Sequence, residues 1–158
     1  MTTKTPQYNK VLEFLQKHPM GILSTVGEDS TPWGAAIYYI VDEDFNFYFV
    51  TRSETFKYQN IKNNSGVALT IADPETQQTV QLSGKVSTMP VQKYMDVFFD
   101  KFAAIRPEGD YKWAPPVDKL QAGKYVPLQI IPTKLQYADY GKNRIEVHGD
   151  YIEQIISS

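Results

Sequence analysis

Residues 48–57 read Tyr48-Phe49-Val50-Thr51-Arg52-Ser53-Glu54-Thr55-Phe56-Lys57 and join an aromatic strand to a short helix. The helix is predicted over Ser53–Lys62, with Ser53 as a possible N-cap. Between the two elements the turn offers three hydroxyls and two cations. A helix N-terminus attracts anions because its first N–H groups lack partners and its dipole is positive there. The pattern fits a phosphate-binding turn, and it also fits an ordinary capped helix with solvated charges.

One helix and three strands are expected up to this turn. The apolar residues Tyr8, Val11, Leu12 and Leu15 recur at the spacing of one helical face, and Asn9 is a possible cap. The predicted elements are a helix over residues 8–18 and strands over 21–26, 33–41 and 45–51. The strand over 33–41 is apolar on both faces, which predicts that both faces are covered. A short acidic link predicts that it forms a hairpin with the next strand.

Further strands and a second long helix follow the turn. The predicted elements are strands over 67–71, 79–86, 125–131 and 134–137, a helix over 90–104, a loop over 106–124 and a last strand within 144–156. The apolar stripe of the helix is expected at Val91, Tyr94, Met95, Phe98 and Phe102. Pro127 predicts a sheet edge or a bulge. Consecutive strands with short links predict an all-β-dominated fold with flanking helices, whose antiparallel sheet closes into a barrel.

Composition limits the possible functions. The 158 residues suit a single domain, residues 1–158, with barrel strands at about 20–89 and 125–140. A net charge of −2 argues against nucleic-acid or anionic-membrane binding. The absence of Cys excludes disulfides and thiolate chemistry, and two His are too few for a multi-His metal centre. No signal peptide or membrane-spanning run is found, so a cytoplasmic protein is expected.

An ordered series of segments resembles the pyridoxamine 5′-phosphate oxidase-like family of FMN-binding split barrels. Residues 20–26 look like the family's first strand, and residues 32–39 look like the strand along the flavin. Residues 51–57 are similar to its Thr-x-x-x-Ser-x-Lys phosphate turn, with Thr55 in place of Ser. Residues 58–69 resemble its next segment, with Ser65 in place of Pro. Residues 80–86, with Gly84, and the closing hairpin within 125–137 complete the series.

The resemblance implies a cofactor site and a homodimer. The residues implied to hold the FMN phosphate are Thr51, Thr55 and Lys57, with Arg52 as a helper. Backbone groups of Ala35, Ile37 and Tyr38 would face the isoalloxazine ring, and Thr79 would lie near the flavin. The flavin would lie at the interface of the homodimer, where Trp113 or Tyr137 of the second copy would cover it.

Three positions depart from the family's oxidases of vitamin B6. Ala35 and Ile40 align with an Arg and a Lys at the two ends of the flavin strand, and Phe56 replaces a second Arg before Lys57. Fewer cations should weaken the binding of a phosphate group. The resemblance therefore implies a divergent relative and not a vitamin B6 oxidase.

The implied function is an FMN-dependent oxidoreductase acting on a small molecule. The cofactor would supply the chemistry, so no catalytic side chain and no metal ligand is predicted. One alternative is a non-catalytic protein on the same fold that binds FMN, haem or a deazaflavin; His18 and His148 are the imidazoles available to haem. Another is a structural dimer without a cofactor. For Trp33, stacking on a flat ligand and packing in the core remain open.

Overall fold

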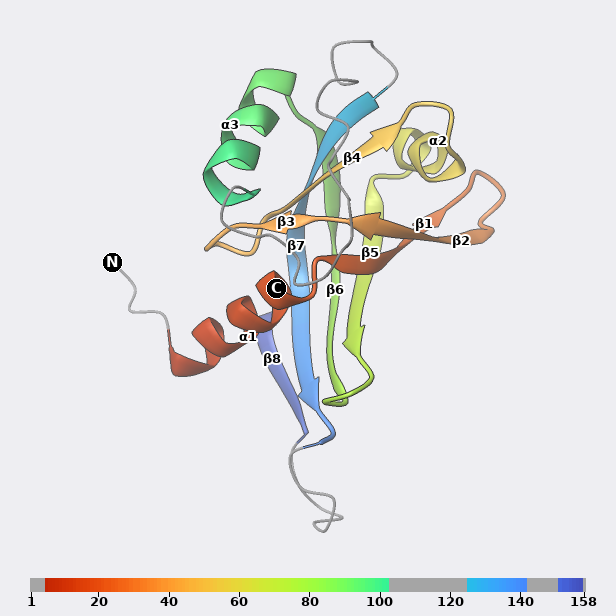
Figure 1. The fold of residues 1–158 in the computed structure, drawn as a ribbon. Helices are drawn as coiled ribbons and strands as arrows, with labels where there is room; N and C mark the ends of the chain where they lie inside the picture. The colour runs from red at the N-terminus through yellow and green to blue at the C-terminus, as the bar shows by residue number, and fades with distance from the viewer. Residues whose placement is uncertain (1–4, 103–124, 142–150, 158) are drawn as a thin grey trace.

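The protein is built around one antiparallel sheet that curls into a barrel (Figure 1). The computed structural model describes residues 5–102, 125–141 and 151–157. Its sheet has the order β2-β1-β5-β6-β7-β4-β3, and β8 pairs with β7. The bounds are α1 Pro6–Lys17, β1 Met20–Val26, β2 Pro32–Tyr38, β3 Ile40–Val41, β4 Phe47–Arg52, α2 Phe56–Asn63, β5 Gly66–Asp73, β6 Gln78–Thr88, α3 Val91–Phe102, β7 Tyr125–Asp139 and β8 Ile152–Ser157.

A single extended segment closes the barrel. The predicted strand over 33–41 divides at Tyr39 into β2, which pairs with β1, and β3, which pairs with β4. Because β2 and β3 are the two ends of the sheet order, their continuity joins the two edges. The predicted hairpin between β3 and β4 is confirmed, and Asp42 fixes its turn by accepting hydrogen bonds from the backbone N–H groups of Asp44 and Asn46.

The predicted closing hairpin is wrong, because residues 125–139 form one long strand, β7. Its first half pairs with β4 and its second half with β8, while β6 runs along its other side. Pro132 and Thr133, which looked like a break, lie at a register shift where β6 passes Gly84. Pro127 pairs with Val50 of β4 on one side and has no partner on β6, so it lies at a local edge of the sheet, as predicted. It lies one residue beyond the last β6 pair on β7, so its missing N–H costs the β6 ladder nothing.

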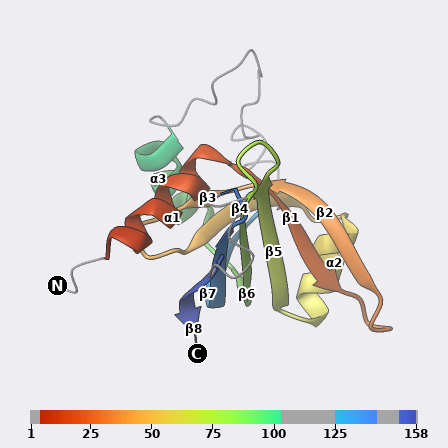
Figure 2. The same cartoon turned by 90° about the horizontal axis from the view of Figure 1, so that it is seen from below.

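The core fills the barrel and the space between the sheet and α1. Figure 2 shows this helix beside the strands. Alternate residues of the strands point inward, including Phe47 and Phe49 of β4, both fully buried. The helix contributes Val11, Phe14 and Leu15 to the same cluster. Much of the aromatic content of the chain is thus a packing requirement of a small barrel.

The start of α1 and the burial of one residue of α3 differ from the predictions. The N-cap of α1 is Thr5, whose hydroxyl accepts from the N–H of Tyr8, so the proposed Asn9 cap is wrong. Pro6 then occupies the first turn, where its missing N–H costs nothing. In α3, Tyr94 is buried, but Val91 is 38% exposed and does not belong to the apolar stripe. The side chains of Phe98 and Phe102 lie outside the described part.

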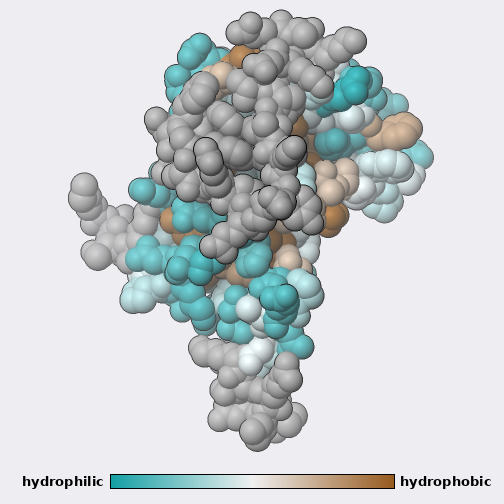
Figure 3. All heavy atoms as spheres, viewed as in Figure 1, coloured by the Kyte–Doolittle hydropathy of each residue, from teal (hydrophilic) through white to brown (hydrophobic). Residues whose placement is uncertain are grey.

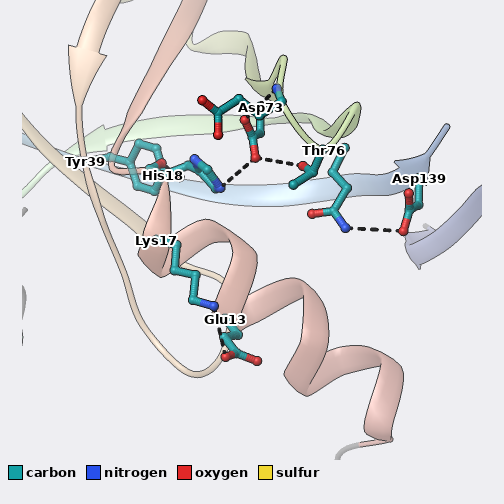
Figure 4. A network of polar contacts seen from close by, with 9 residues as sticks. Glu13, Lys17, His18, Tyr39, Asp73, Thr76 and Asp139 are labelled. Atoms are coloured by element: carbon teal, nitrogen blue, oxygen red, sulfur yellow. Dashed lines mark hydrogen bonds and ion pairs between the residues drawn. The ribbon is translucent and has the colours of Figure 1, made fainter. Parts of the chain in front are cut away.

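Polar contacts tie α1 to the sheet (Figure 4). The buried Tyr39 hydroxyl donates to the carbonyl oxygen of Leu15 at 2.9 Å and also contacts the carbonyl oxygen of His18, so it completes the helix C-terminus. The His18 Nε2 lies 3.6 Å from Asp73 Oδ2, at the β5–β6 turn, and its ring packs on Phe14. Hydrogen bonds, chiefly from Thr76, lower the pKa of Asp73.

In the described part of the chain, no helix combines the length and the apolar character that crossing a membrane requires.

Candidate functional site

The turn after β4 brings Thr51 and Thr55 together. Thr51 is 3% exposed, and its Oγ1 lies 3.2 Å from Oγ1 of Thr55. Thr55 Oγ1 donates to the carbonyl oxygen of Arg52 at 2.8 Å, so the hydrogen between the two hydroxyls belongs to Thr51. Both hydroxyl protons are used inside the turn in this arrangement. An anion would accept from these hydroxyls only after they rotate.

The helix α2 starts without a side-chain cap. Its N-cap residue is Thr55, whose side chain accepts no hydrogen bond from the first turn, and the first turn contains no acid. The predicted cap at Ser53 is wrong, because the helix begins three residues later, at Phe56. The first backbone N–H groups of α2 therefore remain available to an anion from outside the helix.

Lys57 is the cation nearest to these amides in sequence. It is half-buried, and burial lowers the pKa of its ammonium group. Among the residues that the structure describes, no carboxylate forms an ion pair with it. A partly desolvated cation without an anionic partner is a favourable place for a phosphate group.

Arg52, the predicted helper, already has two neighbours. Its guanidinium forms an ion pair with Glu54 and lies over the ring of Tyr125, with Cζ 6.0 Å from the ring centroid. Sequence reasoning missed both residues. Glu54 is visible two positions along the turn, but Tyr125 comes from β7 and faces Arg52 only through strand pairing.

The strand β2 presents an open edge beside α2. Within the described residues β2 pairs with β1 alone, so alternate backbone N–H and C=O groups on its other edge are free of strand partners. The Ile37 side chain faces the core and that of Tyr38 faces outward, as expected from strand alternation. Ala35 is partly buried. Backbone groups of these residues therefore remain candidates for contact with a flat ring.

The prediction that both faces of residues 33–41 are covered is wrong within one copy. Of the nine large apolar side chains that are exposed in the described part of the chain, five lie on β1, β2 and the start of α2, namely Met20, Ile22, Trp33, Tyr38 and Phe56. Trp33 is 44% exposed and packs on Phe56, with ring centroids 4.9 Å apart, so the core alternative for Trp33 is also wrong. Figure 3 shows apolar surface among hydrophilic residues on one face of the molecule.

Thr79 and Tyr137 lie apart from the turn. Thr79 pairs with Ala138 near the end of β7, whereas Thr51 pairs with Val126 near its start. Twelve residues of strand separate the two pairs, about 40 Å at 3.3 Å per residue. Thr79 would therefore reach a cofactor at the turn only from a second copy.

Tyr137 is 2% exposed in its own core, so it cannot cover a ligand of a second copy as predicted. The Phe14 ring packs against the ring of Tyr137. Burial is the main cause that raises the pKa of Tyr137 to about 12. Trp113 and His148 lie outside the described residues.

Two further observations concern other kinds of site in the described residues. No cluster of three possible metal ligands occurs within the described ranges. A cavity of about 500 Å³ lies over β5, β6, β7 and β8, lined by Gln81, Lys134 and Gln136 among others. None of the predicted cofactor-binding residues lines it. The turn at residues 51–57 and the open edge of β2 remain the arrangement best suited to a phosphorylated, flat ligand.

Comparison with known proteins gives a family and a fold. The family model described as pyridoxamine 5′-phosphate oxidase matches residues 9–124. The curated UPF0306 protein PM1958 of Pasteurella multocida is 32% identical over 87 residues, which cover 52% of this chain and 58% of the relative. The matched part is thus under two thirds of the length of that relative.

Three solved structures share the fold. An F420 reductase has a TM-score of 0.56 at 26% identity, covering 78% of this chain and 94% of its own. A pyridoxamine 5′-phosphate oxidase-related FMN-binding protein of Nostoc punctiforme has 0.62 at 11%, covering 97% and 91%. A heme-binding protein of Mycobacterium smegmatis has 0.66 at 12%, covering 98% and 60%. These likenesses confirm the predicted antiparallel split barrel.

Proposed function

The chain belongs to the pyridoxamine 5′-phosphate oxidase family, and from this premise we propose that it is an FMN-dependent oxidoreductase acting on a small molecule. The observation that carries the proposal is Lys57, half-buried beside the uncapped start of α2 and without a carboxylate partner among the described residues. This chemistry fits the terminal phosphate of FMN. Bound FMN would supply the electron or hydride transfer.

The remaining parts of the proposed site orient the cofactor. The Lys57 ammonium and the first amides of α2 bind the phosphate, and the Thr51–Thr55 hydroxyl pair keeps the turn in place. Backbone groups at the open edge of β2 meet the ring. Apolar neighbours there exclude water from the reacting face.

A homodimer with the cofactor at its interface is part of the proposal. Met20, Ile22 and Tyr38 expose apolar surface on adjacent strands, and a single copy leaves them in water. A second copy on this face would bury them and would shelter the ring.

A deazaflavin is the second candidate cofactor. It is supported by the solved F420 reductase, which at 26% shows the highest sequence identity of the three solved structures compared above. A deazaflavin with a phosphate-linked side chain would use the same turn. Haem receives less support, because the His18 Nε2 faces Asp73 and its ring packs on Phe14.

The direct test is spectroscopic. The purified full-length chain is expected to bind added FMN, with a shifted visible spectrum, and to turn over a reduced nicotinamide with an electron acceptor. A protein that binds F420 but not FMN would support the second candidate. Failure to bind either would contradict the proposed function.

The proposal excludes vitamin B6 oxidation as the physiological reaction. Neutral residues stand at Ala35, Ile40 and Phe56, so few charges remain to hold a second phosphate on the substrate. Incubation of the FMN-loaded protein with pyridoxamine 5′-phosphate is expected to give no aldehyde product above the rate of free FMN. Formation of pyridoxal 5′-phosphate with turnover would contradict this point.

A further inference from the structure

Two side chains, those of Glu54 and Tyr125, contact the guanidinium of Arg52. Glu54 forms an ion pair with it from within the same turn, and both side chains are about half exposed, at 51% and 54%. Tyr125 supports it from the neighbouring strand, as the cross-strand partner of Arg52 on the same face of the sheet. The arrangement satisfies the Arg52 cation without any ligand.

Strand alternation separates Arg52 from the hydroxyl pair. Thr51 is buried and points to the core side of β4, so Arg52, the next residue, starts on the opposite face. Reaching an anion beside Thr55 would require Arg52 to leave Glu54 and the Tyr125 ring. The Glu54 carboxylate would also repel a phosphate that approached the turn.

From these contacts we propose that Glu54 is a positioning residue that withholds Arg52 from the phosphate group, so that Lys57 is the cation of the turn that binds it. The inference rests on the proposed function. Glu54 would then determine how tightly the turn binds the phosphate. The Arg52–Glu54 pair contributes no net charge, and Lys57 contributes one positive charge.

The test is a double-mutant cycle on the full-length chain. The dissociation constants of FMN and of riboflavin, which lacks the phosphate, are measured for wild type, E54Q, R52Q and R52Q/E54Q. The ratio of the two constants isolates the phosphate from the ring. E75Q is the matched control, because Glu75 is an exposed acid in the distant β5–β6 turn and its loss changes the net charge equally.

E54Q is expected to tighten FMN binding by about two- to fivefold, the range set by exposed ion pairs, and to leave riboflavin binding unchanged. R52Q alone leaves the Glu54 charge unpaired and should weaken FMN binding by no more than about fivefold. In the E54Q background, R52Q should abolish the gain. E75Q should leave the ratio as in wild type.

Two results would overturn the inference. One is a loss of FMN affinity of tenfold or more in R52Q alone, which would mean that Arg52 already binds the phosphate. The other is an unchanged ratio in E54Q. If K57M weakens FMN binding while E54Q has no effect, only the role of Glu54 fails. If the wild type prefers neither FMN nor any other phosphorylated flavin over riboflavin, the proposed function fails as well.

Discussion

Lys57 lies in a half-buried position that penalises its charge unless an anion is near. Burial lowers the pKa of the ammonium because water stabilises the charged form better than the protein does. A bound phosphate reverses the balance by adding an opposite charge within hydrogen-bond distance. The pKa of Lys57 is therefore expected to differ between the ligand-free protein and the protein with a phosphate bound.

A pH dependence of stability follows for the ligand-free protein. Between the lowered pKa of folded Lys57 and its unfolded value of 10.5, the unfolded state binds more protons, so the free energy of unfolding rises with pH. K57M lacks this term. Urea unfolding of both proteins from pH 8 to 10.5 should show wild type gaining stability relative to K57M, and saturating FMN should remove the gain. A difference that stays constant with pH would contradict the burial of this charge.

Sequence reasoning found the turn but not its internal contacts. The resemblance placed Thr51, Thr55 and Lys57 in one turn because they stand in one short segment, and their binding of a phosphate stays a prediction. The pairing of Arg52 with Tyr125 was not, since it depends on the register of two strands more than seventy residues apart. Thr79 was expected near the cofactor from its place in the family pattern, yet the length of β7 separates it from the turn within one copy.

At the level of elements, the β6–β7 pair depends on a glycine. A Cβ at Gly84 would lie 2.5 Å from the carbonyl oxygen of Ile131, so the backbone at the register shift would have to move. G84A is expected to destabilise the fold by about 1–3 kcal/mol, the usual cost of forced overpacking. G34A is the matched control, since its Cβ would meet only a side-chain atom, at 3.6 Å. Equal urea midpoints for the two variants would contradict this account of the shift.

The junction of β2 and β3 depends on Tyr39. Its hydroxyl is buried and satisfies carbonyl oxygens at the end of α1. Y39F would leave these oxygens without their donor, and a loss of about 1–3 kcal/mol is expected. Y140F, at a tyrosine that is 49% exposed, should cost less. Thermal or urea unfolding measures both, and an unaffected Y39F would show that the hydroxyl does not secure the helix.

Element types were more predictable than their partners. The alternation of β6 and the apolar spacing of α1 are local patterns, and both elements form as expected. The hairpin expected within residues 125–137 was wrong because Pro132 and Thr133 mark a register shift and not a turn. The division of residues 33–41 at Tyr39 could not be predicted from the local sequence, because it arises from the closure of the barrel.

At the scale of the whole molecule, the exposed β1–β2 face is expected to bind a second copy. I22E places a charge in the centre of that face, where Ile22 is 44% exposed. In analytical ultracentrifugation, the mass of the wild type should be twice the 18.1 kDa of one chain. The I22E variant should shift toward the monomer mass and should bind FMN more weakly. I152E is the control, because Ile152 is similarly exposed, at 50%, on β8. A monomeric wild type, or dimeric I22E, would contradict the proposed interface.

The proposed function depends on the binding of the flavin phosphate by the turn after β4. Titration of the full-length chain with FMN and with riboflavin, for wild type, K57M and the exposed control K62M, tests this most directly. Removal of a charge-assisted hydrogen bond worth about 1.5–3 kcal/mol should weaken FMN binding by roughly ten- to a hundredfold in K57M. Riboflavin binding and K62M should remain as in wild type. Equal FMN affinity in wild type and K57M would contradict the account.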